Sequence, residues 1–356
     1  MLTTLVTFII VLGILIFVHE FGHYIVAKMT GVRVEEFALG FGPRLVGFEK
    51  GETQYSIRAF PLGGFCKMTG EFPHAEEDLE GEELEIYNET IKEGRALFQK
   101  SVLERFGVIF TGPVMNFLLA VILFTIIFSI AGVPASPSNA PIIGDLVPNR
   151  PAADAGLKIG DEIVSIEDQP VNNWDDITGI LNQVEDDQVK VIVEREGEQK
   201  EFNLTPASEE NTDRKVIGIF PKVVNKQVGF GTAIWRAIQQ TWLLMKAIVV
   251  GFWQMLTFQI KAEVGGPVTI ARMIGQAAEV GWVYLLRFTA LISVNLGIIN
   301  LIPFPALDGG RILFLIIEVI RGEAVDPEKE GIVHFIGFVV LMILMAFIIY
   351  KDIAAL

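Results

Sequence analysis

The most constraining feature of this chain is a cluster of ionisable residues at the end of a long apolar run. Residues 2–18 carry no charged side chain and lead into His19-Glu20-Phe21-Gly22-His23. Histidines four positions apart project from one face of a helix, where both imidazoles can bind one Zn²⁺. Glu20 is placed to accept a proton from an attacking water. Ionisable groups at bilayer depth are costly, which favours a metal centre over a structural histidine pair.

The composition is that of a membrane protein with a substantial polar part. Hydrophobic residues make up 51% of the chain and charged residues 20%, so some segments face lipid and others fold in water. The formal net charge of -15 argues against nucleic acid as a partner, because phosphates require a basic surface. Cys66 is the only cysteine, which excludes an intramolecular disulfide and a cysteine-rich metal site.

Four segments have close to the ~20 apolar residues that a membrane-spanning helix requires. They are 2–27, 106–133, 288–307 and 332–350. The first lacks the basic start and the small-residue cleavage site of a signal peptide. Bases follow the first segment and precede the second, so the positive-inside rule places residues 28–105 in the cytosol. The sequence therefore predicts a polytopic α-helical protein of the cytoplasmic membrane with four transmembrane helices.

The first polar insertion, 32–104, contains a predicted β-hairpin. Residues 54–60 alternate in hydrophobicity after a turn at 49–51, and Pro61-Leu62-Gly63-Gly64-Phe65 is expected to interrupt the strand. An apolar edge beside a membrane active site can pair with an extended peptide by strand addition. The hairpin can equally well only pack against the site, and the pattern leaves both interpretations open.

Several charged residues are expected to take no part in the chemistry. Residues 71–93 are dense in Asp and Glu, a composition typical of a solvated loop without a function of its own. His74 in this loop and His334 in the last span are not expected to bind metal. Glu318 and Arg321 are spaced to pair with each other on a helix, which indicates a structural role.

The second insertion, 141–223, follows a linker-like stretch at 134–139. The pattern predicts a helix near 174–184 and strands at 142–147, 161–167, 189–195 and 201–204. Residues 151–161 (PAADAGLKIGD) and 172–176 (NNWDD) resemble the signature of bacterial PDZ domains. The resemblance implies an α+β domain with a groove for chain termini or extended peptides, or the same fold kept as a steric plug. The orientation of the first two spans places this insertion outside the cytoplasm.

The stretch 234–260 is rich in Trp, Leu and Phe, but charged and amide residues interrupt it. Its longest uncharged piece, 247–260, is short for a span, so we expect amphipathic helices at the outer interface over 229–280. If this stretch does not span, the first and third spans run in the same direction. At 1.5 Å per residue, His19 and Asp308 then lie at similar depths near the cytosolic face.

Asp308 is the best candidate for a third metal ligand. Catalytic zinc sites usually have three protein ligands and an open position, and two histidines leave one missing. Asp308 ends an apolar run in 300–310 (NLIPFPALDGG), where two prolines and two glycines give an irregular backbone that can line a wet cavity. Asn300 in the same run is interpreted as a substrate contact rather than as a helix-packing residue, and Asn295 is left undecided.

Together these motifs resemble the bacterial site-2 protease family. The resemblance covers nearly the whole chain and rests on 19–23, 40–43, 61–65, 111–117, the PDZ-like insertion, 265–267 and 300–310. It implies an intramembrane zinc metalloprotease with His19, His23 and Asp308 as metal ligands and Glu20 as base. It also implies that Asn300 contacts the substrate and that the hairpin near Gly63 and Gly64 holds the substrate as an added strand. Family substrates are single-span membrane proteins, such as anti-sigma factors, and remnant signal peptides.

Two other functions would use parts of the same pattern. A catalytically idle membrane scaffold that presents a PDZ domain would have no use for Glu20. A metal transporter would need acidic or histidine residues along a path through several spans, and the second and fourth spans offer almost none. The pattern therefore favours hydrolysis of peptide bonds within or near transmembrane segments.

Overall fold

The computed structural model describes residues 2–71, 79–137, 139–147, 150–184, 188–208, 215–259 and 265–354. They fall into two compact units. The first unit comprises Met1–Ser129 and Gly229–Leu356, and the second comprises Ile130–Val228. The first unit contains the membrane helices and every predicted site residue.

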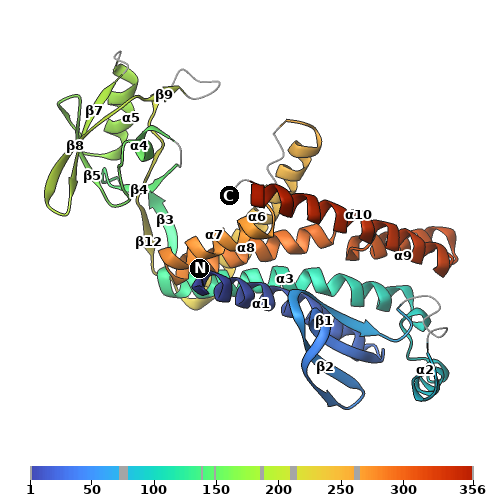
Figure 1. The fold of residues 1–356 in the computed structure, drawn as a ribbon. Coiled ribbons are helices and arrows are strands. Elements are labelled where there is room, and N and C mark those ends of the chain that lie inside the picture. The colour runs from blue at the N-terminus through green and yellow to red at the C-terminus, as the bar shows by residue number, and fades with distance from the viewer. Residues whose placement is uncertain are drawn as a thin grey trace. The chain divides into compact units, whose positions relative to one another are not determined.

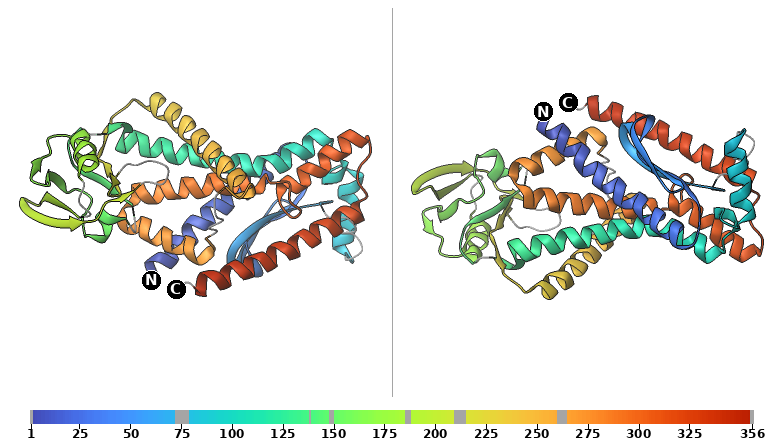
Figure 2. Two further views of the ribbon diagram at one scale, coloured as in Figure 1. Left: turned by 90° about the horizontal axis from the view of Figure 1, so that it is seen from above. Right: turned by 90° about the horizontal axis from the view of Figure 1, so that it is seen from below.

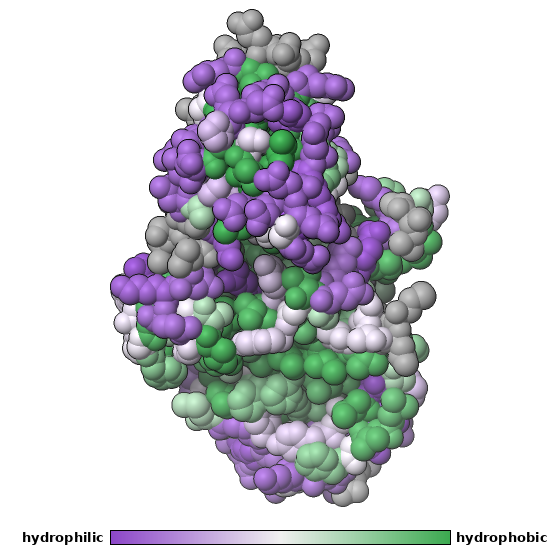
Figure 3. Space-filling view, turned by 90° about the vertical axis from the view of Figure 1, so that its left-hand side faces the viewer, coloured by the Kyte–Doolittle hydropathy of each residue, from purple (hydrophilic) through white to green (hydrophobic). Residues whose placement is uncertain are grey.

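Four helices in the described ranges are long and apolar enough to cross a membrane (Figure 1). They are α1 (Leu2–Met29), α3 (Val102–Ala131), α8 (Trp282–Asn300) and α10 (Pro327–Ala354). Such helices are hydrophobic all round, because lipid as well as the helix bundle favours apolar side chains. On the face drawn in Figure 3, hydrophobic residues cover a broad area of the first unit, as expected of a surface that lipid covers.

The third predicted span, 288–307, is displaced toward the N-terminus in the structure. The helix α8 ends at Asn300, residues 301–307 form turns, and a separate helix α9 begins at Asp308 and ends at Arg321. The helix thus begins before the predicted span 288–307 and ends at Asn300, where the irregular backbone expected for 300–310 starts. Pro303 and Pro305 lack the backbone N–H that a continuing helix needs, so the helical hydrogen bonds are interrupted in this segment.

A bent β-sheet follows α1 directly. β1 (Val34–Lys50) and β2 (Thr53–Met68) pair antiparallel. Residues 34–39 of β1 lie between two parts of β2, because they pair with 54–57 and also with 64–68. The expected interruption at 61–65 is thus a bend within one strand, helped by Gly63 at a φ of 141°. Among the described residues, 64–68 pair only with β1 and form an edge of the sheet.

Ion pairs and aromatic contacts fix this sheet against α1. Glu52, in the turn between the strands, accepts hydrogen bonds from Lys28 Nζ at 2.6 Å and from Arg95 Nη2 at 2.7 Å. The Tyr24 and Tyr55 hydroxyls lie 2.6 Å apart. Burial raises the pKa of Glu52, but hydrogen bonds from Lys28 and Arg95 outweigh burial and lower the pKa below its ordinary value.

Part of the acidic insertion is regular structure. Glu82–Lys92 form the helix α2, and Leu97–Gln99 form a short 3-10 helix, η1. The prediction of a continuous loop over 71–93 is therefore wrong for residues 82–92. His74 lies outside the described residues.

The stretch 234–260 belongs to a long amphipathic helix, α6 (Phe230–Leu256). Its buried residues are the small Ala233, Ala237 and Thr241, four positions apart, and α6 contacts α8. Its tryptophans at 235, 242 and 253 are exposed. The helix α6 is not among those apolar enough to span, as expected, and its location at the membrane interface stays a prediction.

The helix α7 (Pro267–Val280) packs against α1, α8 and α10 (Figure 2). Its N-cap residue, Gly266, has no side chain that could accept a hydrogen bond. The side chain of Asp352, near the end of α10, caps the helix instead. The Asp352 carboxylate accepts hydrogen bonds from Gly266 N at 3.1 Å, Thr269 N at 2.9 Å and Thr269 Oγ1 at 3.0 Å. An anionic cap satisfies free N–H groups at a helix start and suits the positive end of the helix dipole.

The second unit is an α+β domain. Its four-stranded antiparallel sheet has the order β6 (Gln169–Pro170), β5 (Glu162–Ile166), β7 (Val189–Arg195) and β8 (Glu198–Leu204). It also contains α4 (Pro151–Asp154) and α5 (Trp174–Gln183). Three two-stranded pairs complete it: β3 (Val133–Pro137) with β12 (Val223–Lys226), β4 (Ile143–Leu146) with β11 (Ile219–Pro221), and β9 (Ala207–Ser208) with β10 (Lys215–Val216).

These elements confirm the predicted strands and the helix near 174–184. Alternating residues of β7, Val189, Val191 and Val193, are fully buried in the core of this unit, as the period-2 pattern requires. The linker predicted at 134–139 is wrong, because residues 133–137 pair with β12. Prolines are compatible with a two-stranded pair, where each strand has a free edge that needs no N–H donor.

We expect Glu52 to stabilise the sheet in a pH-dependent way. Its contribution is fully present above the ordinary glutamate pKa of 4.5 and is lost as the pH falls through its lowered folded-state value. Glu52→Gln should lower the free energy of unfolding by about 1 kcal/mol at neutral pH. Thermal unfolding followed by tryptophan fluorescence checks this, with the exposed Glu49→Gln as control. An equal difference between Glu52→Gln and the wild type at pH 7 and pH 3 would contradict it.

Candidate active site

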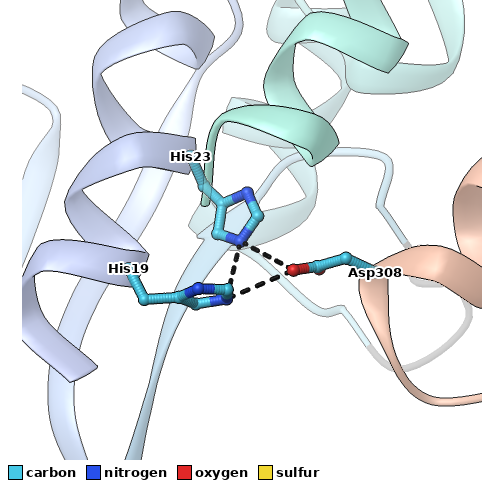
Figure 4. Close-up of side chains that lie close together, drawn as sticks. All are labelled: His19, His23 and Asp308. Carbon is cyan, nitrogen blue, oxygen red and sulfur yellow. Dashed lines mark hydrogen bonds and ion pairs between the residues drawn. The ribbon is translucent and has the colours of Figure 1, made fainter. Parts of the chain in front are cut away.

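Three predicted ligands from distant parts of the chain meet in the first unit (Figure 4). The helix α1 presents His19 and His23 on one face, and Asp308 lies in the first turn of α9. The Asp308 Oδ2 atom lies 3.2 Å from His19 Nε2 and 3.6 Å from His23 Nε2, and the two Nε2 atoms are 3.3 Å apart. Side chains 289 residues apart in sequence therefore converge on one point.

The spacing of these atoms fits a tetrahedral zinc site. Bonds of 2.0–2.1 Å to a tetrahedral ion keep the ligand atoms about 3.3 Å apart, close to all three observed distances. Both histidines are only 8% exposed. The Asp308 Oδ2 atom is buried and accepts no hydrogen bond within the described part of the chain, although a buried carboxylate oxygen normally does. A cation at this point would satisfy it.

Groups behind the histidines set their orientation. His23 Nδ1 donates a hydrogen bond to the Val108 carbonyl at 2.8 Å, which leaves Nε2 as the free lone pair that faces Asp308. Asn116 Nδ2 lies 3.1 Å from His19 Nδ1, while Asn116 Oδ1 is buried without a partner in the described residues. A half-turn of this amide lets Oδ1 accept the His19 Nδ1 proton, which leaves His19 Nε2 free to bind a metal.

Helix α3 approaches the two histidines closely. A Cβ atom placed on Gly112 would overlap the imidazole of His23 and lie 3.0 Å from His19 Cε1. Ser293 Oγ on α8 donates to the Asn116 carbonyl at 2.7 Å, so α8 and α3 are joined at the same level. From the sequence, residues 111–117 were noted only as part of the family resemblance. The contact between Asn116 and His19 was not predicted.

One cavity of ≈ 570 Å³ unites the predicted site residues. It is lined by the three candidate ligands and also by Glu20, Asn300, Gly63 and Gly64. Asn300 Nδ2 lies 3.5 Å from His19 Nε2. The edge strand 64–68 forms one wall of this cavity. The arrangement places a proton acceptor, an amide and a strand edge around one potential metal position.

The edge strand lies tightly against α1. A Cβ atom on Gly64 would meet Ile16 Cγ2 at 2.7 Å and Glu20 Cγ at 3.3 Å, so only glycine permits this approach. Cys66 also lines the cavity, but burial raises the pKa of its thiol, which therefore stays protonated and is a poor nucleophile.

Two charged residues of the cavity wall were missed by the sequence reasoning. Arg311 Nη1 donates to Glu71 Oε1 at 2.5 Å, and both residues line the cavity. The interpretation of 71–93 as a solvated loop is thus wrong for Glu71, whose side chain is only 11% exposed. Only their positions in the sequence could have indicated that they lie near the site. Arg311 is three positions after Asp308 on one helix, and Glu71 closely follows the strand 64–68.

The remaining charged and histidine residues have structural contacts. Ala306 N donates to His334 Nδ1 at 2.9 Å, so His334 supports the turns at 301–307 and is not part of the ligand cluster. The predicted pair between Glu318 and Arg321 is wrong. Glu318 instead accepts from Arg105 on α3 at 2.5 Å, and Arg321 donates to Glu323 at 2.8 Å. Asn295 is half-buried and does not line the cavity.

Comparisons with known proteins agree with this geometry. Residues 7–344 match the model of peptidase family M50. The regulator of sigma-W protease RasP from Bacillus subtilis (strain 168) is 35% identical over 99% of this chain and 99% of its own length. The zinc metalloproteases RasP from Geobacillus kaustophilus and Oceanobacillus iheyensis are 34% and 32% identical, with coverage of at least 98% of either chain.

A solved PDZ domain from Listeria monocytogenes matches 26% of this chain and 94% of its own, with 18% identity and a TM-score of 0.21, too low to bear on the fold. The family match and the full-length relatives, by contrast, cover both the ligand cluster and the cavity. The chain therefore belongs to peptidase family M50, the site-2 protease family, and is a membrane-embedded zinc metalloprotease.

Proposed function

We propose that the protein cleaves peptide bonds within or near the transmembrane segments of single-span membrane proteins. The observation that carries the proposal is the single cavity that joins the ligand cluster, Glu20 and a strand edge among helices of spanning length. The name of the B. subtilis relative refers to regulation of sigma-W, so anti-sigma factors are the first substrate class to test. Remnant signal peptides are the second, because they too are short membrane segments.

In this proposal His19, His23 and Asp308 hold the zinc ion. When bound, zinc polarises the scissile carbonyl and lowers the pKa of water. Glu20 lies in the cavity wall beside the ligands, accepts the proton of the attacking water and delivers it to the leaving amine. Asn300, whose amide also faces the cavity, donates a hydrogen bond to the substrate backbone or to the developing oxyanion.

The substrate is held as an added strand. A helical segment hides its carbonyls in its own hydrogen bonds, so it must unwind before Glu20 and water can act on it. The strand 64–68 offers backbone groups along the cavity, beginning at Gly63 and Gly64. Pairing with this edge would replace the helical hydrogen bonds and keep the segment extended.

The second unit is proposed to be an extracytoplasmic PDZ domain, and the active site to lie near the cytosolic face of the cytoplasmic membrane. The sequence signatures at 151–161 and 172–176 and the antiparallel sheet with α5 support the first part. The basic residues after α1 and before α3 support the second part.

We expect Glu20→Gln to bind zinc as the wild type does and to lose nearly all cleavage. The amide cannot accept the proton, but it is not in the ligand set. Metal analysis of the purified protein and cleavage of a helical membrane segment in detergent measure both effects. Asp308→Asn is the matched contrast and should lose zinc as well as cleavage, because a neutral amide replaces an anionic ligand. Full activity of Glu20→Gln would remove the proposed mechanism.

Asn116→Leu should weaken zinc binding roughly 10–100-fold, the usual effect of losing the partner that orients a histidine ligand. Competition with a chelator of known affinity measures it. Thr125→Val serves as control, because Thr125 lies further along α3 and its hydroxyl donates to the Val121 carbonyl of the same helix. Wild-type zinc affinity in Asn116→Leu would show that His19 is oriented by other groups.

Thiol labelling tests the proposed orientation. In a Cys66→Ser background, a cysteine in place of Asp175 should react with an impermeant reagent outside intact cells, whereas one in place of Glu80 should react only after the cells are opened. A cysteine in place of Gly322, after α9, should behave like the one at Glu80. Labelling from outside at Glu80 would invert the topology. Labelling from outside at Gly322 alone would mean that α6 spans the membrane.

A further inference from the structure

We propose that Glu71 and Arg311 close one end of the substrate-binding edge of β2 and so determine which peptide bond is cleaved. The two residues are called the edge cap below. This inference rests on the proposed function, because it concerns the strand that is proposed to hold the substrate. It assigns a specificity-determining role to an ion pair outside the ligand cluster.

The hydrogen bonds around Met68 show which peptide groups face the open edge. Thr69 N donates to the Arg33 carbonyl at 3.0 Å, on the side of β1. Met68 N instead donates to Glu71 Oε2 at 3.2 Å. Successive residues of a strand turn their N–H groups to opposite edges, so Cys66 and Gly64 face the same edge as Met68. This is the edge that an added strand would use.

Glu71 occupies both backbone groups of Met68. Its carboxylate accepts from Met68 N, and its own N–H donates to the Met68 carbonyl at 3.2 Å. An added substrate strand would hydrogen-bond to the N–H and the C=O of every second residue of β2. It can therefore pair with Gly64 and Cys66 but cannot continue past Cys66 unless Glu71 is displaced.

Arg311 fixes this closed end relative to the metal cluster. Its guanidinium binds the second carboxylate oxygen of Glu71, and the side chains are 26% and 11% exposed. Arg311 lies three residues after Asp308, within the first turn of α9. The end of the strand edge and the Asp308 carboxylate are thus attached to the same rigid helix turn. A charge-assisted hydrogen bond of this kind is among the stronger contacts a protein can make.

The consequence is a fixed register. A strand that begins to pair at the edge cap places a defined residue beside the ligand cluster. A slip by one residue would turn every substrate side chain to the other face, so the nearest alternative register differs by two residues. A pair with only a structural role would change stability but not the position of the cleaved bond.

The experiment maps the products of a helical membrane-segment substrate by mass spectrometry, with the purified full-length protein in detergent. The wild type should cleave mainly one bond. In Glu71→Ala the fraction cleaved two residues away should rise roughly tenfold, the effect of one lost hydrogen bond to a charged group. Glu71→Gln should keep more of the wild-type product than Glu71→Ala, because its amide oxygen can still accept from Met68 N although it cannot also accept from Arg311.

A second ion pair on the same helix provides the control. Arg105 and Glu318 join α3 to α9 at 2.5 Å, with side chains 17% and 16% exposed, and neither lines the cavity. Glu318→Gln should leave the product pattern unchanged. An unchanged pattern in Glu71→Ala would overturn the edge cap, as would an equal change in Glu318→Gln. Failure of the wild type to cleave any membrane segment would instead overturn the proposed function.

Register can also be read without cleavage. In a Glu20→Gln background, a photoreactive residue moved stepwise along the substrate should cross-link to β2 at one position with the wild-type edge cap. With Glu71→Ala the cross-links should spread to positions two residues away. The same cross-link map in both proteins would overturn the inference even if Glu71→Ala were inactive.

Discussion

The structure depends on one unfavourable juxtaposition: a carboxylate and two imidazoles in contact among apolar helices. Asp308 Oδ2 and the two Nε2 atoms lie within 3.6 Å of one another, and the carboxylate oxygen has no hydrogen-bond donor among the residues that the structure describes. Such a group is stable only when a cation compensates its charge and the surroundings hold it in place. The neighbouring helices supply that support: α3 comes close enough through Gly112, and the carbonyl of Val108 orients His23.

The segment between α8 and α9 brings the carboxylate to this point. Residues 301–307 leave the helical path at the prolines, and Ala306 adopts a φ of 73°, a conformation that is uncommon for a residue with a side chain. The strained turn is supported from α10, where His334 accepts the Ala306 N–H. A helix that continued without this break would carry Asp308 away from the histidines. The irregular backbone is therefore part of the site.

Local sequence patterns predicted the spanning helices and the shared face of the two histidines. The features that were not predicted depend on contacts between residues far apart in the sequence. Apolar length identified the four spanning helices, and the spacing of His19 and His23 predicted one shared face. The bend of β2 was not predicted, because Pro61–Phe65 looks like a break unless the second pairing with β1 is known. Glu71 lies in an acidic run whose composition indicates solvent, and only the contact with Arg311, 240 positions away, shows otherwise.

The cap on α7 has a consequence for how the site is assembled. The helix α7 packs against α1, which carries both histidines, yet the carboxylate that caps α7 belongs to Asp352 on α10. Synthesis proceeds from the N-terminus, so α1 and α7 leave the ribosome before Asp352 exists. Until Asp352 has been synthesised, the first N–H groups of α7 lack this acceptor. The N-terminal cap of a helix that packs on the metal-binding helix thus depends on a residue of the last membrane helix.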